Sequence, residues 1–594
     1  MRIQKTERGA IEKVIKTFVK CIREYKLPTI LTLVFIIAEV FIEVLIPTYT
    51  ARLVNGVQAS APIAELLPAG LTLVAMAIVS LLCGGGAGYT GAKASAGFAK
   101  NVRHDVFERI QHFSFQNIDK FSTASLVTRL TTDISNVQMA FMMSIRIAVR
   151  APLMFVFSIV MAYRMGGSLA ATFLVVVPVL IVGLLLIARK AMPAFRSVFR
   201  RYDRMNESVE ENVRAMRVVK GFAREEYEKE KFGKASGSIA KDFTKAERIV
   251  ALNNPLMTLC MNFNMVFVLM VGAKLIVTSR GTLINVGEIS AMLTYGMQIL
   301  MSLMMISMIY VMMTISYESM KRIVEVLVEK PSLKMKDEPI TEVRDGSVEF
   351  TDVSFKYSES AEKYALEDVD LHIPSGSTVG IIGGTGVGKS TLVQLIPRLY
   401  DTTEGSVKVG GVDVRDYDIE ALRGAVSMVL QKNELFSGTI RENLRWGDPD
   451  ATDEEIEQAC RLAQADEFIR SFPDGYDTHI EQGGTNVSGG QKQRLCIARA
   501  LLKKPKILIL DDSTSAVDTR TDALIRAGFR EYIPETTKII IAQRVASVED
   551  ADLILVMDNG RIVGRGTHAE LMRSSEIYRE VYEQQTNGGD EDEE

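Results

Sequence analysis

Six apolar segments in the first half of this 594-residue chain constrain its fold more than any other feature. A helix crosses the hydrocarbon core of a bilayer with about 20 consecutive apolar residues, and each segment has that length and composition. A buried soluble core is the alternative, but it does not account for so many long apolar runs. We therefore predict an α-helical membrane domain with six transmembrane helices. The segments span residues 27–54, 67–92, 139–163, 167–188, 255–278 and 283–315.

The distribution of Lys and Arg predicts how these helices are oriented. Eight basic side chains precede or border the first segment, whereas the connection Asn55–Glu65 has none. Cytoplasmic loops carry the excess of basic residues in membrane proteins. Both termini are therefore expected in the cytoplasm, in a multi-pass protein of the cell membrane. The long connections 93–138 and 189–250 are rich in both charges and helical in pattern, as expected of cytoplasmic extensions.

Composition also suggests the boundaries of the remaining parts. Residues 1–26 include an amphipathic stretch at 10–24, which fits either a helix lying on the inner leaflet or the start of the first span. We expect the transmembrane domain to cover 27–325 and a polar linker 326–345. Residues 346–582 change to short strands, turns and helices, as in an α/β domain, and 583–594 form an acidic tail expected to be disordered.

Charged residues inside the predicted spans need an explanation because they are costly in a membrane. Glu39 and Glu43 lie one helical turn apart near the middle of the first span. They could serve a cationic cargo or a proton, or they could make a structural hydrogen bond. Arg146 and Arg150 share a face of the third span, and we expect them near the inner boundary with their side chains reaching toward the interface.

The last predicted span is unusually rich in methionine. Flexible thioethers suit a surface that accepts varied apolar shapes. They equally suit helix packing that slides between two states. The candidates for contact with cargo are Tyr295, Gln298, Met301 and Met305, together with Glu39 and Glu43.

A phosphate-binding loop follows the strand-like segment Val379–Ile382. Its sequence is G-x-x-x-x-G-K-S, placed between a strand and a helix as this motif requires. Backbone N–H groups of such a loop face phosphates at a helix N-terminus, the lysine adds a positive charge, and the serine hydroxyl can bind Mg²⁺. The sequence therefore predicts ATP and Mg²⁺ as cofactors. The loop residues are Gly383, Gly384, Thr385, Gly386, Val387, Gly388, Lys389, Ser390 and Thr391.

The run Ser488-Gly489-Gly490-Gln491, ahead of the apolar strand that ends in Asp511, resembles the signature of ATP-binding cassette (ABC) transporters. The resemblance covers essentially the whole chain, because six spans fused to one P-loop NTPase cassette are similar to a half-size ABC exporter. It implies that Asp511 helps to hold Mg²⁺, usually through water. It also implies that Ser488–Gln491 bind the ATP of a second cassette, so that a partner chain is required.

Other positions take their roles from the same resemblance. Tyr357 matches the aromatic residue that stacks on adenine, and Gln431 matches the glutamine that touches Mg²⁺ and contacts the membrane domain. The run from Ser515 to Asp518 matches the loop through which two cassettes communicate. By position alone, the segments around Asn117–Leu126 and Phe222–Phe232 would be the coupling helices that transmit motion.

Two residues depart from the family pattern in the same pocket. The residue after Asp511 is normally a glutamate that acts as general base, but here it is Asp512, which is shorter by one C–C bond, roughly 1.5 Å. The usual switch histidine is replaced by Gln543, whose amide can hydrogen-bond a phosphate but cannot carry a proton. A third departure is Gln482, in a loop where relatives usually have an acidic residue. These changes predict a site that binds ATP well and hydrolyses it slowly.

The intact signature beside an altered catalytic pocket favours a heterodimer. The partner would be a second half-transporter that supplies the glutamate and the histidine. The expected function is ATP-driven export of small hydrophobic or amphipathic compounds by alternating access. A lipid flippase or a peptide exporter remains an alternative within transporters, and an ATP-gated channel or a non-transporting regulatory subunit outside them. The net charge of −4 gives no signal for nucleic acid.

Overall fold

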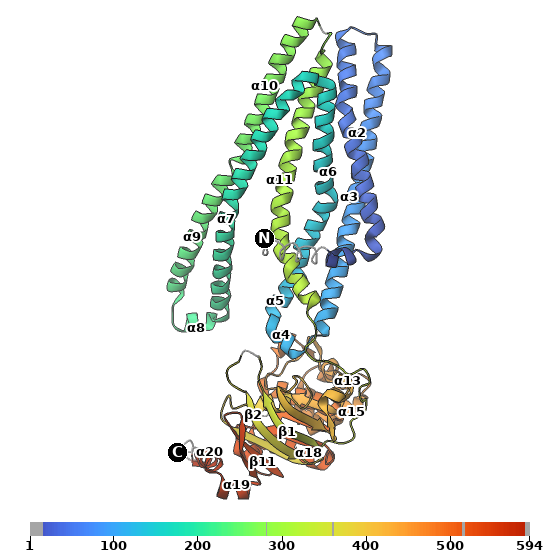
Figure 1. The fold of residues 1–594 in the computed structure, drawn as a ribbon. Coiled ribbons are helices and arrows are strands. Elements are labelled where there is room, and N and C mark those ends of the chain that lie inside the picture. The colour runs from blue at the N-terminus through green and yellow to red at the C-terminus, as the bar shows by residue number, and fades with distance from the viewer. Residues whose placement is uncertain (1–15, 281, 359–360, 514–516, 588–594) are drawn as a thin grey trace. The chain divides into compact units, whose positions relative to one another are not determined.

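The chain folds as two compact units, each described here by itself. The computed structural model describes residues 16–280, 282–358, 361–513 and 517–587 (Figure 1). The first unit comprises Met1–Gln111 and Thr123–Glu329, and the second comprises His112–Ser122 and Lys330–Glu594. A short segment within the expected transmembrane domain therefore belongs to the second unit. Of the predicted N-terminal amphipathic helix, residues 10–15 lie outside the described residues, whereas residues 16–20 are helical.

Long helices form the first unit, and six of them each contain all or most of one predicted span (Figure 1). Five continuous helical stretches are long and apolar enough to cross a membrane, and one of these, Thr123–Phe195, contains α6 and the first part of α7. A chain in lipid must satisfy its backbone hydrogen bonds internally, which is why apolar runs of this length fold as helices. The helices are α2 (Lys26–Gln58), α3 (Ile63–Gln111), α5 (Thr123–Thr128), α6 (Ile134–Gly166), α7 (Thr172–Arg214), α8 (Met216–Gly221), α9 (Glu225–Val250), α10 (Asn253–Ser279) and α11 (Val286–Val328).

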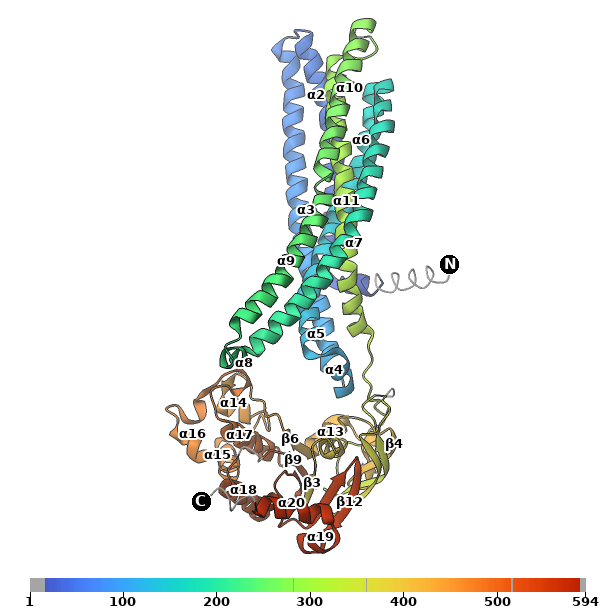
Figure 2. The same cartoon turned by 90° about the vertical axis from the view of Figure 1, so that its left-hand side faces the viewer.

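Packing between distant helices builds the core of this unit. Helix α11 lies along α6 and α2, and α3 lies along α2. Their contact surfaces bury Ile36, Val40 and Val44 of α2 together with Met292 and Ile299 of α11. Helices α7 and α9 run side by side and are joined by the short helix α8 (Figure 2).

The short helices expected to couple the two parts of the chain are only partly where we predicted them. Helix α4 (Phe115–Phe121) overlaps the first predicted segment, and it belongs to the second unit. The second prediction was wrong by several residues. The short helix α8 ends at Gly221, and residues from Glu225 onward already form the long helix α9. Acidic side chains at Glu225, Glu226 and Glu228 favour a helix N-terminus there.

Two main sheets form the second unit. An antiparallel sheet has the order β2-β1-β4-β5, and a six-stranded sheet has the order β12-β11-β3-β10-β9-β6. Only β12 is antiparallel in the larger sheet, because β6, β9, β10, β3 and β11 all pair in parallel. The strands are β1 (Val348–Phe355), β2 (Leu366–Ile373), β3 (Thr378–Gly383), β4 (Glu404–Val409), β5 (Val412–Asp413), β6 (Val426–Val429), β9 (Ile507–Asp511), β10 (Thr537–Ile541), β11 (Leu553–Asp558) and β12 (Arg561–Gly566), with a further pair β7 (Gly438–Thr439) and β8 (His479–Ile480).

Helices cover these sheets and extend further along the chain than we expected. Helix α20 continues to Asn587, so the first residues of the predicted disordered tail are helical. Tyr578 of α20 is fully buried and Tyr582 packs against the same core, which explains why this end is ordered. The helices are α12 (Lys389–Gln394), α13 (Ile419–Ala425), α14 (Ile440–Leu444), α15 (Asp453–Leu462), α16 (Asp466–Ser471), α17 (Gly489–Leu502), α18 (Thr519–Tyr532), α19 (His568–Ser574) and α20 (Glu576–Asn587).

Parallel pairing brings the ends of four strands to one edge of the larger sheet. Ile541 of β10 pairs with Ile381 of β3 on one side and with Asp511 of β9 on the other. The carboxyl ends of parallel strands are where open α/β sheets bind their ligands. The segments that follow β3, β6, β9 and β10 are therefore placed to form one site.

Candidate functional site

The loop between β3 and α12 is held open by glycines with positive φ angles. Gly386 has φ 82° and Gly388 has φ 99°, a region that side chains rarely adopt. A Cβ atom on Gly388 would lie 2.6 Å from the carbonyl oxygen of Ala365, so no larger residue fits. The Lys389 ammonium donates to the carbonyl oxygens of Gly383 and Gly384, both at 2.7 Å. This is the backbone form required for a loop that wraps around phosphates.

A carboxylate and a hydroxyl meet at the start of α12. The Ser390 hydroxyl donates to Oδ1 of Asp511 across 2.9 Å. Burial raises the pKa of Asp511 above its usual value and lowers the pKa of Lys389. Two oxygen ligands beside a lysine match the donor set that binds Mg²⁺ and phosphate together. The residues present therefore fit Mg²⁺-ATP, with Ser390 and Asp511 on the metal side.

Asp512, in the expected position of the catalytic base, is held by two side-chain amides. Nε2 of Gln543 donates to Oδ2 of Asp512 across 2.6 Å, and Nε2 of Gln431 donates to the same oxygen across 3.3 Å. Asp512 is buried and its φ angle is +50°. A carboxylate oxygen has two lone-pair sites, and here two amides use both of them. A water molecule that approaches Oδ2 therefore competes with both amides for that oxygen.

These groups line one cavity of about 430 Å³. Tyr357 stands at its border and hydrogen-bonds the Thr391 hydroxyl across 2.9 Å. Val387 does not line the cavity but packs beneath the loop against Gly383 and Gly384. Ala365 and Ile541 line it although no sequence motif marks them. The lining residues are Tyr357, Ala365, Gly383, Gly384, Thr385, Gly386, Gly388, Lys389, Ser390, Thr391, Gln431, Asp511, Asp512, Ile541 and Gln543.

The signature residues lie outside this cavity. Ser488 caps the N-terminus of α17, where its hydroxyl accepts from the backbone N–H of Gln491 across 3.3 Å. The Gln491 side chain in turn accepts from the backbone N–H of Ser488 across 2.9 Å. The helix start between them is formed by Gly489 and Gly490. None of these residues is among those that line the cavity around Lys389.

Asp518, in the loop between β9 and α18, is also separate from the cavity. Asp518 caps α18 by accepting from the backbone N–H of Thr521 across 2.9 Å. Its neighbours Ser515 and Ala516, predicted to face a second cassette, lie outside the described residues. Among the described residues, the structure therefore brings together the P-loop, Gln431, Asp511, Asp512 and Gln543, and leaves Ser488–Gln491 and Asp518 apart.

The loop that contains Gln482 forms hydrogen bonds with the segment after Gln431 and with the signature helix α17. The backbone N–H of Gly483 donates to the carbonyl oxygen of Leu435, in the segment after Gln431, across 3.0 Å. The Lys492 ammonium, on α17, donates to the carbonyl oxygen of Gly483 across 2.6 Å. On the Gly483 side both contacts are made by backbone atoms, so neither contact depends on the side chain of Gln482.

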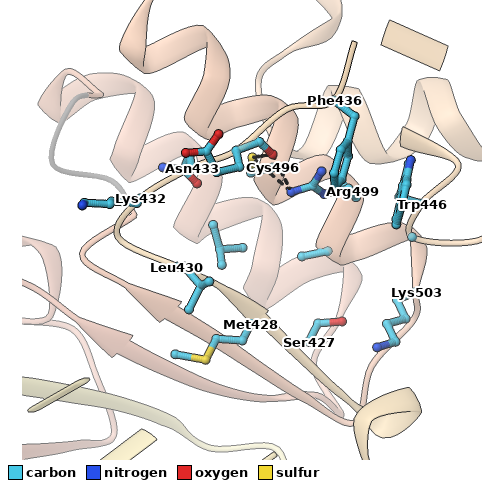
Figure 3. Close-up of a pocket in the computed structure, with 14 residues that line it drawn as sticks. Ser427, Met428, Leu430, Lys432, Asn433, Phe436, Trp446, Cys496, Arg499 and Lys503 are labelled. Carbon is cyan, nitrogen blue, oxygen red and sulfur yellow. Dashed lines mark hydrogen bonds between the residues drawn. The ribbon is translucent and has the colours of Figure 1, made fainter. Parts of the chain in front are cut away.

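A second cavity of about 340 Å³ lies next to the segment around Gln431 (Figure 3). Leu430 and Lys432 line this cavity, whereas Gln431 between them lines the nucleotide cavity. At its rim the rings of Phe436 and Trp446 stack with their centroids 4.3 Å apart. The segment 430–432 is thus a wall that both cavities share.

Three charged residues of the transmembrane helices, Glu39, Glu43 and Arg150, form one cluster. Nη1 of Arg150 donates to Glu39 across 2.6 Å, and its Nη2 donates to both carboxylate oxygens of Glu43, at 2.8 and 2.9 Å. The prediction that Arg150 reaches toward the inner interface is therefore wrong. The two glutamates near the middle of α2 hold the guanidinium group instead.

The other candidates for cargo contact differ in how exposed their side chains are and in whether they already have a partner. Tyr295 is fully buried, and its hydroxyl donates to the carbonyl oxygen of Val44 across 2.8 Å. This residue packs α11 against α2, so the expected cargo contact is not supported in this conformation. Gln298 accepts from the Ser158 hydroxyl across 3.0 Å. Met301 and Met305 are exposed, with 52% and 39% of their surfaces accessible.

Comparison with known proteins agrees with this arrangement. A family model described as the ABC transporter transmembrane region matches residues 29–320, and one described as ABC transporter matches residues 366–515. The uncharacterized ABC transporter ATP-binding protein YfiB of Bacillus subtilis is 36% identical over 564 residues, which cover 95% of this chain and 97% of the relative. This chain belongs to the ABC transporter family. It is an ABC half-transporter of the exporter type.

This ABC half-transporter is also similar to a second relative in sequence and to a solved exporter in structure. The fatty acid ABC transporter ATP-binding/permease protein of Mycobacterium bovis is 34% identical over 480 residues, covering 81% of this chain and 75% of the relative. A bacterial Atm1-family ABC exporter with ATP bound matches in structure with a TM-score of 0.81 at 24% identity, covering 95% of this chain and 98% of that chain. The second match supports the fold alone.

Proposed function

We propose that this chain is one subunit of a heterodimeric ABC exporter and that its own ATP site is degenerate. In this proposal the site around Lys389 keeps ATP for long periods and hydrolyses it slowly. The signature Ser488–Gln491 completes the active site of the partner, which carries the glutamate and the histidine that this chain lacks. The cassette and both termini face the cytoplasm, as the basic residues around the first span indicate.

One observation carries the degenerate-site part of the proposal. Oδ2 of Asp512 accepts hydrogen bonds from the amides of Gln543 and Gln431. A general base must come within about 2.6–3.2 Å of the proton that it removes. The shorter aspartate starts further from the nucleotide than a glutamate would, and two protein donors hold its oxygen. Gln543 offers an amide where a histidine could carry charge.

The need for a partner follows from the separation of the motifs. The P-loop and the signature belong to the same chain, but they do not line the same cavity. Backbone N–H groups at a helix N-terminus bind phosphate, and the signature forms the start of α17. A second cassette would place its nucleotide there.

The cargo that we propose is small and hydrophobic or amphipathic. The exposed methionines Met301 and Met305 offer the adaptable surface that such a cargo needs. The name of the M. bovis relative, a fatty acid transporter, supports an amphipathic compound.

Restoring the family residues tests the degenerate site. The complex should be purified through a tag on this chain, and its steady-state ATPase activity measured in nanodiscs. The double variant Asp512→Glu with Gln543→His should raise turnover, because a positioned general base contributes about 10²–10⁴-fold to such reactions. The matched control adds Lys389→Met to the double variant, which removes ATP binding at this site and should cancel the gain. Unchanged turnover in the double variant would refute the proposal.

A further inference from the structure

The loop that carries Gln543 is tied to the C-terminal helix by a single side chain. Gln585 of α20 donates from Nε2 to the carbonyl oxygen of Gln543 across 2.8 Å. Its Oε1 accepts from the backbone N–H of Val545, also across 2.8 Å. One amide therefore satisfies the backbone on both sides of Arg544. Val545 is buried, so its N–H group has a strong need for an acceptor.

Helix α20 is a firm support for this contact. Tyr578 is fully buried and its hydroxyl hydrogen-bonds Nδ1 of His568 across 2.8 Å. The ring of His568 also lies against the ring of Tyr582, with the centroids 5.1 Å apart. Tyr578, Tyr582 and Val581 all belong to the core that α17 and β9 share. The helix is thus fixed to the body of the domain over the two turns before Gln585.

We infer that Gln585 is a positioning residue of the nucleotide site. Its amide fixes the backbone of Gln543, and the Gln543 side chain then reaches Asp512 across 2.6 Å. Gln585 does not line the nucleotide cavity, so it acts only through the loop. The C-terminal helix thereby sets where the amide of Gln543 stands beside the bound nucleotide. This inference rests on the cavity being this chain's ATP site, but not on the site being degenerate.

The contact itself can be tested without any assay of activity. In the complex purified through a tag on this chain, Gln585→Ala should speed hydrogen–deuterium exchange in a peptide that contains Val545. The matched control is Gln584→Ala, one residue earlier on the same exposed helix end, which should leave that exchange unchanged. Equal exchange in both variants and the unmodified complex would overturn the inference, whatever the ATPase activity of the complex.

The effect on the nucleotide is tested by ATP release. The complex is loaded with radiolabelled azido-ATP, chased with unlabelled ATP for increasing times and irradiated, and the label on this chain is measured. Loss of the hydrogen bond that positions Gln543 should make release from Gln585→Ala about threefold to tenfold faster, as expected for one net hydrogen bond. Gln585→Glu keeps an acceptor for Val545 but loses the donor to Gln543, so it should fall between Gln585→Ala and the unmodified chain.

A double-variant comparison separates positioning from simple support of the fold. If Gln585 acts through Gln543, then Gln585→Ala should have little further effect on release in a Gln543→Ala background. The same acceleration in both backgrounds would overturn the inference, and so would an equal acceleration by Gln584→Ala. Failure of the degenerate-site proposal would instead be seen as unchanged turnover after Asp512→Glu with Gln543→His, which leaves this comparison intact.

Discussion

At the residue scale, three side chains that each bind two partners hold the nucleotide site and the transmembrane charge cluster together. Oδ2 of Asp512 accepts from two glutamine amides, Gln585 bridges two backbone groups, and Arg150 pairs with two glutamates. Each arrangement leaves an unsatisfied group behind when the central residue is removed. The consequences of substitution are therefore specific, and they differ from those of a neighbouring residue of the same type.

The Arg150 cluster provides a prediction of this kind. Arg150→Met leaves Glu39 and Glu43 facing each other without a counter-charge. Breaking a fully buried ion pair costs about 3–5 kcal/mol. The Arg150 side chain is 32% exposed, so we expect a smaller loss of stability, about 1–3 kcal/mol. The thermal unfolding temperature of the purified complex should fall by several degrees.

Arg146, one turn earlier on the same helix, is the matched control. Among the described residues it forms no ion pair with Glu39 or Glu43, and Arg146→Met should change the unfolding temperature much less. Adding Glu39→Gln and Glu43→Gln to Arg150→Met should recover part of the lost stability, since it removes the uncompensated charges. Equal effects of Arg146→Met and Arg150→Met would contradict this account of the cluster.

At the element scale, helix α4 packs within the second unit through a few polar contacts. The Tyr400 hydroxyl donates to Asp119 of α4 across 2.8 Å, and burial together with Asp119 raises the pKa of Tyr400. The hydroxyl therefore stays protonated at neutral pH and remains a donor. Asn117 adds a bond from its Nδ2 to the carbonyl oxygen of Lys330 across 3.1 Å. The ring of Tyr400 also lies 5.2 Å from that of Tyr357, at the border of the nucleotide cavity.

Removal of the Tyr400 hydroxyl should loosen α4. A hydrogen bond to a charged group contributes about 1.5–3 kcal/mol, so Tyr400→Phe should raise hydrogen–deuterium exchange in peptides that cover residues 115–121. Tyr364→Phe is the control, because it deletes a hydroxyl that donates to Glu404 across 2.9 Å on an exposed surface of the same domain. The idea fails if α4 exchanges equally in both variants.

Features that depend on residues close together in the sequence could be predicted, whereas contacts between distant residues could not. The P-loop, the signature and the six spans depend on neighbouring residues, and the structure places all or most of each span in one long helix. Glu43, a partner of Arg150, lies on another helix, 107 positions earlier in the chain, and no local pattern indicates that pairing. The start of α9 was missed because position in the chain, rather than a capping signal, was used to place it. Gln585 could not be found, since its role depends on a distant loop.

At the scale of the whole molecule, the two halves of the ATP machinery on this chain serve different sites in our proposal. The P-loop, Asp511 and Asp512 belong to a slow site, and Ser488–Gln491 belong to the partner's active site. Substitutions at the two places should therefore have unequal effects. In a symmetric dimer of identical chains, each change would appear in both sites, and the effects would be alike.

The most direct test compares two variants in the purified complex by steady-state ATPase activity. Ser488→Arg, which blocks the signature, should abolish nearly all hydrolysis because it disables the partner's active site. Asp512→Asn, which removes the carboxylate of this chain's own site, should leave most of the activity. Near-complete loss in Ser488→Arg with near-full activity in Asp512→Asn is the result that we predict. An equally severe loss in both variants would contradict the asymmetric exporter.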